Sequence, residues 1–309
     1  MVWTLLGRSL FAACLILVAS GVFAQGVTTD IRTVVEARLK DAMPKGGLAV
    51  RCPIYDDWVA ARIFVEYGAT YVAEKPAVVP PKCMVGSEAE LAAIQKSLHA
   101  HTARIGGVMV TLQEPALNGL LEAQSVAASS GLAITPRGGS VAAARSYADT
   151  VDLWKSRFEP ALKFWVQNGK IKLAEAAAAR KLPIRQQVEA VLLWEKQGIW
   201  FSKDLSKSIL YSVAIPGASQ HNFMLAVDIE QFSNVKVRQI MADHGWFQTV
   251  KSDLPHFTYL GLKEADLPKN GLTPVTVGGQ KFWVPNVGDE MKEGGVPMTR
   301  PGWRRPRPL

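Results

Sequence analysis

Residues 107–135 read GVMVTLQEPALNGLLEAQSVAASSGLAIT, and this stretch decides the fold class. Residues 107–112 are rich in apolar and β-branched side chains, which predicts a strand. Residues 115–128 begin with a proline and continue with Ala, Leu and Glu, which predicts a helix. A second strand is expected at residues 131–135. A strand, a helix and a strand of these lengths indicate an α+β or α/β core.

The C-terminal side of this core contains helices first and short strands afterwards. Residues 140–200 are dominated by helix-forming residues, and Pro160 and Pro183 are expected to mark the boundaries of two or three helices. Short extended stretches follow Tyr211, and residues 273–284 predict a hairpin with a two-glycine turn. The expected fold is therefore α+β, with a small antiparallel-rich sheet that carries the candidate site and is flanked by several helices.

The N-terminal side predicts a mixture of helical and extended pieces. Apolar side chains recur at helical intervals over residues 30–43. Residues 62–67 and 70–73 are rich in β-branched and aromatic residues, which favours extended structure. Residues 87–101 are expected to form a helix with Ser87 as the N-cap of a capping box. This region is interpreted as a wall-binding unit, a prodomain-like unit, or a flank that completes the core.

Residues 1–24 have the layout of a signal peptide. One positive charge precedes an apolar run at residues 9–23, and the mature chain is expected to start at Gln25. The run is short for a membrane span, so we expect an exported chain, periplasmic or extracellular, without a permanent membrane anchor. Cys52 and Cys83 remain after the leader, and an oxidising compartment favours a disulfide between them. In a cytoplasmic chain they would stay buried thiols.

The formal net charge is +8, and four arginines stand among prolines in the last ten residues. A tail of this composition is expected to be disordered. A basic surface attracts anionic polymers, and no motif of an ordered nucleic-acid reader is present. Export makes peptidoglycan, and not nucleic acid, the expected partner. After the leader, we divide the chain into an N-terminal flank at 25–104, a domain at 105–265 with a helical segment at 155–200, and a hairpin with the basic tail at 266–309.

Two histidines stand in segments that suit a zinc hydrolase. His221 is expected in a loop, Asp228 at the far end of the strand that follows, and His256 on another strand. A catalytic zinc ion takes three protein ligands of the nitrogen and oxygen type and keeps a fourth position open. The ion lowers the pKa of water, and a nearby carboxylate accepts the proton and later returns it to the leaving amine. Asp253, three positions before His256, is placed to be that carboxylate.

The spacing of these residues carries a resemblance to a known family. Ser219 stands two positions before His221, an Asp stands seven positions after that His, and an acidic residue stands three positions before a second His followed by an aromatic residue. This pattern resembles the VanY-like D-alanyl-D-alanine carboxypeptidases, a family of zinc D,D-peptidases. The likeness covers roughly residues 105–262. The zinc motif is its specific part.

The resemblance implies one zinc ion and a carboxylate that transfers protons. The ligands would be His221, Asp228 and His256. Asp253 would act as general base and acid. The implied reaction is hydrolysis of a peptide bond near the C-terminus of a peptidoglycan stem peptide, with D-Ala-D-Ala as the usual substrate class. An endopeptidase cut within the stem or cross-link would use the same metal chemistry.

The resemblance also implies substrate-binding residues. Ser219 belongs to the motif, and an arginine of the family binds the terminal carboxylate of the substrate. Arg145 fits the spacing of the arginine motif, whereas Arg137 better fits its location just after a strand. A guanidinium suits a carboxylate because its fork donates two parallel hydrogen bonds. We favour Arg145 and keep Arg137 as the alternative.

Two positions depart from the family pattern. Met224 stands where the family usually has Gly, and Asp253 stands where it usually has Glu, which is longer by one methylene. A base displaced by about 1 Å loses on the order of 100-fold in rate. The alternative function is therefore a catalytically impaired, zinc-containing module that binds peptidoglycan without cutting it.

Overall fold

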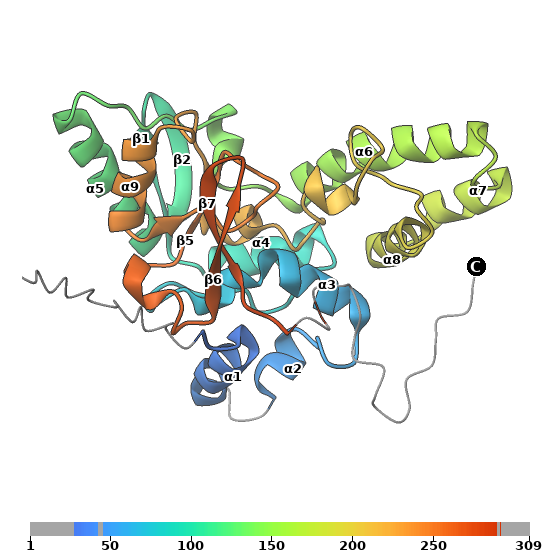
Figure 1. Ribbon diagram of the computed structural model, residues 1–309, viewed down its shortest axis with the longest axis horizontal. Helices are drawn as coiled ribbons and strands as arrows, with labels where there is room; N and C mark the ends of the chain where they lie inside the picture. The colour runs from blue at the N-terminus through green and yellow to red at the C-terminus, as the bar shows by residue number, and fades with distance from the viewer. Residues whose placement is uncertain (1–27, 43–45, 289–290, 292–309) are drawn as a thin grey trace, which may run out of the picture.

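The structure, a computed structural model, describes residues 28–42, 46–288 and 291. The expected signal peptide and the basic tail lie outside the described residues. Within those residues, helices alternate along the chain with three small antiparallel sheets (Figure 1). The predicted α+β class is confirmed.

A three-stranded antiparallel sheet lies at the centre of the candidate site. Its strands have the order β3 (Ala226–Asp228), β5 (His256–Tyr259) and β4 (Trp246–Phe247). Two helices, α5 (Glu114–Ser129) and α9 (Val235–Asp243), pack against each other beside this sheet (Figure 1). Val227 and Phe257 are buried in an apolar cluster with residues of both helices. One face of the sheet therefore packs against the apolar core.

A hairpin precedes α5 and adds to the same apolar cluster. It consists of β1 (Ala100–Ile105) and β2 (Val108–Gln113). The predicted strand at 107–112 and helix at 115–128 are confirmed. The strand predicted at 131–135 is wrong, since the described chain there forms only an isolated bridge between Pro136 and Ile229. The backbone N–H of Thr135 donates instead to the side chain of Gln231, at 2.9 Å.

The N-terminal part is helical where extended pieces were expected. It contains α1 (Ile31–Ala42), α2 (Gly47–Arg51), α3 (Trp58–Tyr67), the 3-10 helix η1 (Gly68–Val72) and α4 (Glu88–Lys96). The prediction of strands at 62–67 and 70–73 is wrong because Asp57 caps α3, accepting from the N–H groups of Val59 and Ala60. The β-branched and aromatic side chains here reflect burial and not a strand. Ser87 caps α4 as predicted, but the helix ends at Lys96.

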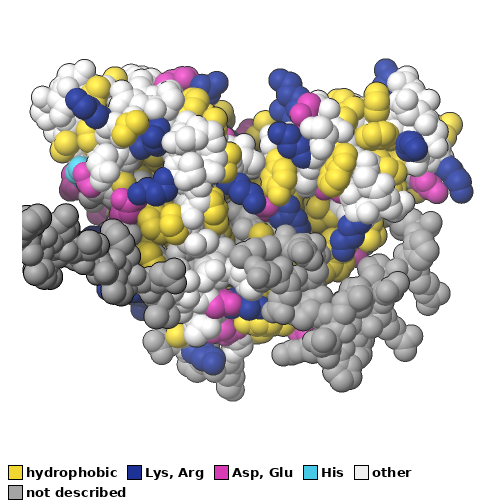
Figure 2. Space-filling model, in the orientation of Figure 1, with side chains coloured by type: hydrophobic (Ala, Val, Ile, Leu, Met, Phe, Trp, Pro, Cys, Tyr) yellow, Lys and Arg dark blue, Asp and Glu magenta, His cyan; other side chains and the backbone are white. Residues whose placement is uncertain are grey.

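Three helices, α6 (Tyr147–Gln167), α7 (Leu173–Lys181) and α8 (Ile184–Glu195), form the predicted helical segment. Pro183 precedes α8 as expected, whereas Pro160 lies inside α6 and does not end it. The helices lie together on the side of the molecule away from α5 and α9 (Figure 1), and the visible surface is hollowed between the two parts (Figure 2). Trp154 and Trp194 are buried in an apolar cluster that also includes residues of α1 and α3. The N-terminal helices and α6–α8 therefore share one core.

The C-terminal hairpin agrees with the sequence pattern. It consists of β6 (Leu272–Val277) and β7 (Gln280–Pro285), with Gly278 and Gly279 in the turn at positive φ. Cys52 and Cys83 form the predicted disulfide, which is compatible with export. Among the described helices, none is long and apolar enough to cross a bilayer.

Candidate metal centre

Strand register brings Asp228 and His256 together. The two residues are directly paired, Asp228 at the end of β3 and His256 at the start of β5. Their neighbours Val227 and Phe257 are buried in the core. Because side chains alternate across a strand, Asp228 and His256 project from the opposite face of the sheet.

His221 reaches the same place from a short 3-10 helix, η4 (Gln220–Phe223). Met224 ends this helix in the left-handed conformation, with φ 55° and ψ 34°. A residue with a Cβ pays roughly 1 kcal/mol or more for that conformation, whereas glycine adopts it without a steric penalty. This backbone turn gives a physical reason for a glycine at the position where the resemblance expects one.

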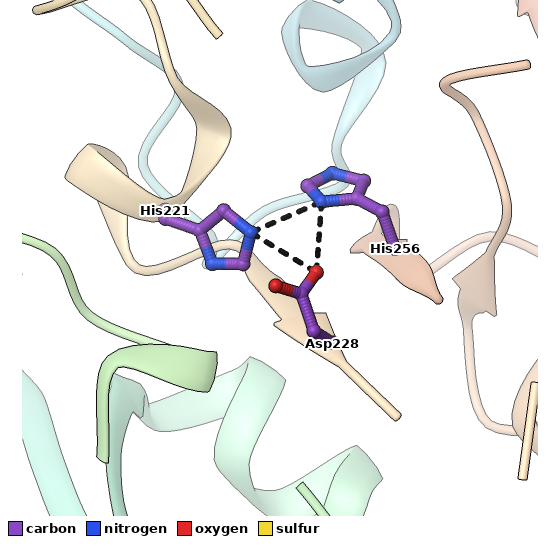
Figure 3. A group of neighbouring side chains, drawn as sticks. All are labelled: His221, Asp228 and His256. Atoms are coloured by element: carbon purple, nitrogen blue, oxygen red, sulfur yellow. Dashed lines mark hydrogen bonds and ion pairs between the residues drawn. The ribbon is translucent and has the colours of Figure 1, made fainter. Parts of the chain in front are cut away.

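Three ligand-type atoms converge at the centre of the site (Figure 3). Nε2 of His221 lies 3.0 Å from Nδ1 of His256. Oδ1 of Asp228 lies 3.3 Å from the first nitrogen and 3.4 Å from the second. Ligand atoms bound at zinc–nitrogen and zinc–oxygen distances in a tetrahedral site are about 3.3 Å apart. The observed separations match that requirement.

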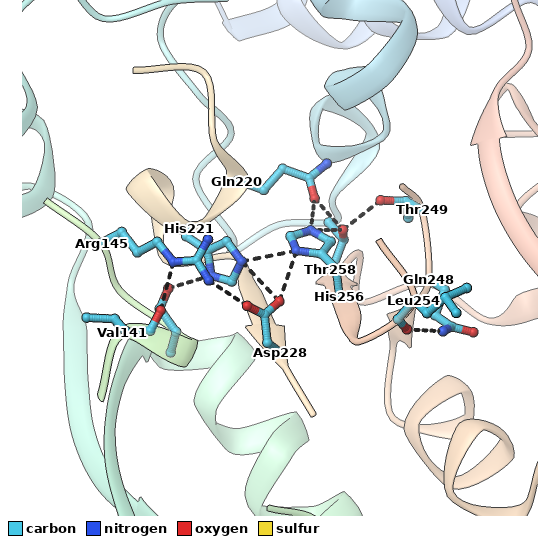
Figure 4. Close-up of polar contacts among 11 residues, drawn as sticks. Val141, Arg145, Gln220, His221, Asp228, Gln248, Thr249, Leu254, His256 and Thr258 are labelled. Carbon is cyan, nitrogen blue, oxygen red and sulfur yellow. Dashed lines mark hydrogen bonds and ion pairs between the residues drawn. The ribbon is translucent and has the colours of Figure 1, made fainter. Parts of the chain in front are cut away.

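The hydrogen bonds on the far side of each ring assign the tautomers. Nδ1 of His221 lies 2.8 Å from the carbonyl oxygen of Ala143, and Nε2 of His256 lies 2.7 Å from Oε1 of Gln220 (Figure 4). Both partners are acceptors, so each of these ring nitrogens carries the proton. The other nitrogen of each ring then presents a lone pair to the centre.

The centre consequently holds three electron-pair donors facing one another. Among the described residues, Oδ1 of Asp228 accepts no hydrogen bond of good geometry. His221 and His256 are buried, and unpaired polar atoms that face one another in a buried site are costly. A cation between the three atoms removes the repulsion. The group formed by His221, Asp228 and His256 could therefore hold a metal ion.

The protonation states also suit a metal ligand set. Burial lowers the pKa of His221 to about 4, so its imidazole is neutral at neutral pH. Burial raises the pKa of Asp228, but below the pKa of His221 the charge and hydrogen bond of its imidazolium, with a contribution from His256, outweigh burial and hold the pKa of Asp228 well below its ordinary value. Metals bind neutral imidazole and ionised carboxylate.

Arg145 fixes the carboxylate of Asp228. Its Nη2 lies 2.5 Å from Oδ2 of Asp228, and its Nε donates to the carbonyl oxygen of Val141 at 2.8 Å (Figure 4). The ion pair occupies one carboxylate oxygen and leaves Oδ1 directed toward the histidines. Arg145 lies in the site, as the sequence prediction favoured.

A cavity of about 210 Å³ adjoins the metal group. Five residues predicted from the sequence line it, namely Arg145, Ser219, His221, Asp253 and His256. Ser219 is buried, and its hydroxyl has no hydrogen-bond partner within the described part of the chain. Its role in binding substrate stays a prediction.

Asp253 lines the cavity, and its side chain is exposed. The protein atoms around its carboxyl group nevertheless remove part of its hydration. This loss of hydration raises the pKa of Asp253, and the negative charge of Asp228 adds to the rise. Electrostatic interaction with His256 and with the guanidinium of Arg145 opposes it. Because the side chain is exposed, solvent screens part of the shift. A carboxyl whose pKa moves toward neutrality is better suited to accept and return a proton.

Arg137 does not line the cavity. Its exposed guanidinium pairs with Glu230 at 3.2 Å and lies 5.9 Å from the ring centre of Phe232. Its backbone N–H donates to the carbonyl oxygen of Asp228 at 2.8 Å. The alternative arginine is therefore next to β3 in the fold, with its side chain engaged elsewhere.

The cavity wall also includes residues that the sequence did not single out, among them two tyrosines and an arginine. Tyr67 comes from the end of α3, Arg157 from α6, and Tyr211 from the 3-10 helix η3 (Ile209–Tyr211). The hydroxyl of Tyr67 is buried and makes no hydrogen bond of good geometry to any described residue. Tyr67 and Arg157 are remote in sequence from the metal motif, whereas Tyr211 precedes it closely, and no local pattern marks any of the three.

Comparisons with known proteins return no family model, no curated protein and no solved structure that matches this chain. The resemblance to the VanY-like peptidases consequently depends on the motif residues. The geometry of these residues supports a metal site.

Proposed function

We propose that this chain is an exported zinc peptidase that hydrolyses a peptide bond in peptidoglycan stem peptides, as VanY-like D-alanyl-D-alanine carboxypeptidases do. One observation carries the proposal: two imidazole lone pairs and a carboxylate oxygen converge at 3.0–3.4 Å beside a cavity. Two histidines and one carboxylate are a ligand set of catalytic zinc sites. The position of Asp253 in the same cavity supports a hydrolytic role.

The residues of the chain have distinct tasks in this reaction. A bound zinc ion supplies Lewis-acid polarisation of the scissile carbonyl and lowers the pKa of water. Asp253 accepts a proton from the attacking water and returns it to the nitrogen of the leaving amine as the C–N bond breaks. The water oxygen ends on the carbonyl carbon, so the products are a carboxylate and an amine.

Arginine side chains in the cavity favour a substrate with a free carboxylate. Arg145 and Arg157 both line it, and Arg145 is already paired with Asp228. Among the described residues, Arg157 has no carboxylate partner. Its Nη1 donates only to Ser156, and its Nε makes no hydrogen bond to any described residue. We assign the terminal carboxylate of the substrate to this pair of guanidinium groups, with Arg157 as the one that is available.

The test is release of D-alanine from a stem peptide that ends in D-Ala-D-Ala, by the purified chain with stoichiometric zinc. We expect release by the wild type and its loss in His256→Ala and Asp253→Ala. Folding of each variant is checked by circular dichroism and zinc content by elemental analysis. No release by a folded, zinc-loaded wild type, even from cross-linked muropeptides, would replace this proposal with the binding module.

A further inference from the structure

A second and larger cavity lies beside the metal cavity. Its volume is about 630 Å³, and its walls come from α3, from α8 and from the segments that follow α8. Tyr211 lines both cavities. Lys251 lines the second cavity, while its chain neighbours Val250 and Ser252 line the first. The two cavities therefore meet at Tyr211 and at the loop that leads to Asp253.

The second cavity carries unbalanced positive charge. Lys196, Lys207 and Lys251 line it, and none of the three forms an ion pair with a described residue. Arg62 is a fourth cation in the wall, but Glu66 neutralises it at 2.6 Å. Glu195 also lines the cavity, and burial raises its pKa to about 7, so it offsets at most part of one lysine charge at neutral pH. Three positive side chains that line one cavity without ion-pair partners suit an anionic ligand.

Aromatic rings and hydrogen bonds hold this wall in place. The ammonium group of Lys196 lies 4.1 Å from the ring centre of Trp58, and that of Lys251 lies 5.8 Å from the ring centre of Tyr211. Cation–π contacts restrict such side chains without neutralising their charge. Glu195 accepts hydrogen bonds from Ser208 and from the backbone of Ile209, which ties the loop after α8 to the helix.

We propose that this basic cavity binds a carboxylate of the peptide whose scissile bond lies in the metal cavity, an inference that rests on the proposed function. The ligand class is an acidic peptide, because the acyl part of a stem peptide continues past the scissile bond and carries a free carboxylate on its glutamyl residue. Tyr211 marks the passage between the two cavities. The N-terminal helix α3 and the helical segment thereby extend the substrate-binding surface beyond the metal motif.

The experiment measures binding separately from hydrolysis. The probes are the tripeptide L-alanyl-γ-D-glutamyl-L-lysine, which has no D-Ala-D-Ala bond, and its D-isoglutaminyl counterpart, in which an amide replaces the carboxylate. Calorimetry compares the wild-type chain, the combined variant Lys196→Gln, Lys207→Gln and Lys251→Gln, and a control with the same loss of charge. The control is Lys163→Gln, Lys170→Gln and Lys203→Gln, three exposed lysines outside the cavity.

We expect the cavity variant to bind the acidic peptide at least roughly tenfold more weakly than wild type, and the control to stay within about twofold. The wild type should prefer the acidic peptide over its amide by a similar factor. Equal binding of the two peptides, or a cavity variant that binds like the control, overturns the inference.

A parallel assay separates this inference from the proposed function. His256→Ala should bind the acidic tripeptide like the wild type, since the basic cavity does not include His256. Lysine-dependent binding without any release of D-alanine would refute the proposed hydrolysis and leave the acidic-peptide site standing. Release of D-alanine with lysine-independent binding would refute only the site.

Discussion

His256 donates a hydrogen bond from Nε2 to Oε1 of Gln220 across 2.7 Å, and this bond turns its Nδ1 toward His221 and Asp228 (Figure 4). The amide nitrogen of Gln220 donates to the carbonyl oxygen of Tyr67 at 3.1 Å, which fixes the orientation of the amide. The end of α3 thus orients a candidate metal ligand that lies 189 positions later in the chain, from Tyr67 to His256. Gln220 is a positioning residue for the candidate metal centre.

Replacing Gln220 should weaken zinc binding without removing a ligand. Outer partners of metal-binding histidines typically contribute a factor of about 10 to 100 in affinity. We expect Gln220→Leu to show a loss of that size, and Gln220→Glu, which still accepts from His256, to lose much less. Competition with a chelator measures the affinity. Gln197→Leu, at an exposed glutamine, is the matched control, and an unchanged affinity in Gln220→Leu would contradict the assigned tautomer.

Zinc should stabilise the folded chain through the three converging ligands. A ligand at 100 times its Kd stabilises the native state by about 2.7 kcal/mol. We expect zinc to raise the Tm of the wild type and a chelator to reverse the rise, whereas His256→Ala responds to neither. Differential scanning fluorimetry with and without zinc measures this. An equal response of both proteins would place the metal elsewhere.

The three candidate ligands follow from the motif spacing and the family resemblance, and strand order explains why two of them meet. Asp228 closes one strand and His256 opens its partner, so antiparallel pairing alone brings them together. The cavity wall could not be predicted in the same way. Tyr67 and Arg157 arrive on helices that are distant in sequence, and only tertiary packing brings them to the site.

The misread elements have a common physical cause, which is that burial overrides local preference. Residues 62–67 contain β-branched and aromatic side chains, yet the capped helix α3 buries them against the core. Pro160 was expected to end a helix, but α6 continues through it and packs Phe158 and Leu162 into the same core. Proline inside a helix costs about 3 kcal/mol, and this cost is outweighed when long-range packing contributes more.

Arg157 should determine affinity for substrates with a free terminal carboxylate. Charge-assisted hydrogen bonds contribute about 1.5 to 3 kcal/mol, or roughly 10- to 100-fold in binding. We expect Arg157→Gln to raise KM by that factor for a peptide ending in D-Ala-D-Ala and to leave the KM of its C-terminal amide unchanged. Arg137→Gln is the matched control, because its guanidinium lies outside the cavity. A rise in KM for the Arg137 variant instead would contradict the assignment.

Asp253 should affect turnover and not metal content. Loss of a general base lowers kcat by about 10² to 10⁴. We expect Asp253→Asn to show a fall in this range while it keeps one zinc ion, measured by D-alanine release and elemental analysis. Asp243→Asn, at an exposed aspartate on α9, should leave kcat unchanged. Full activity of the Asp253 variant would show that another group transfers the proton.

Glu195 should make the stability of the chain depend on pH. The side chain is buried, and burial raises its pKa to about 7 from the ordinary value of 4.5, although Ser208 and the backbone of Ile209 hydrogen-bond to it. The folded state therefore holds the proton more tightly than the unfolded state. The associated stability is complete below pH 4.5 and is lost as the pH rises through about 7.

A shift of this size corresponds to about 3 kcal/mol between the two limits. Between about pH 5 and pH 8, we expect the free energy of unfolding of the wild type to fall by up to that amount relative to Glu195→Gln. Glutamine has no carboxyl proton to lose and can still accept from the N–H of Ile209, so the variant lacks this component. Urea denaturation across the range measures the difference, and Glu122→Gln, at an exposed glutamate, is the control. Parallel pH profiles for wild type and Glu195→Gln would mean that Glu195 stays ionised in the fold, and its two hydrogen bonds would then outweigh its burial.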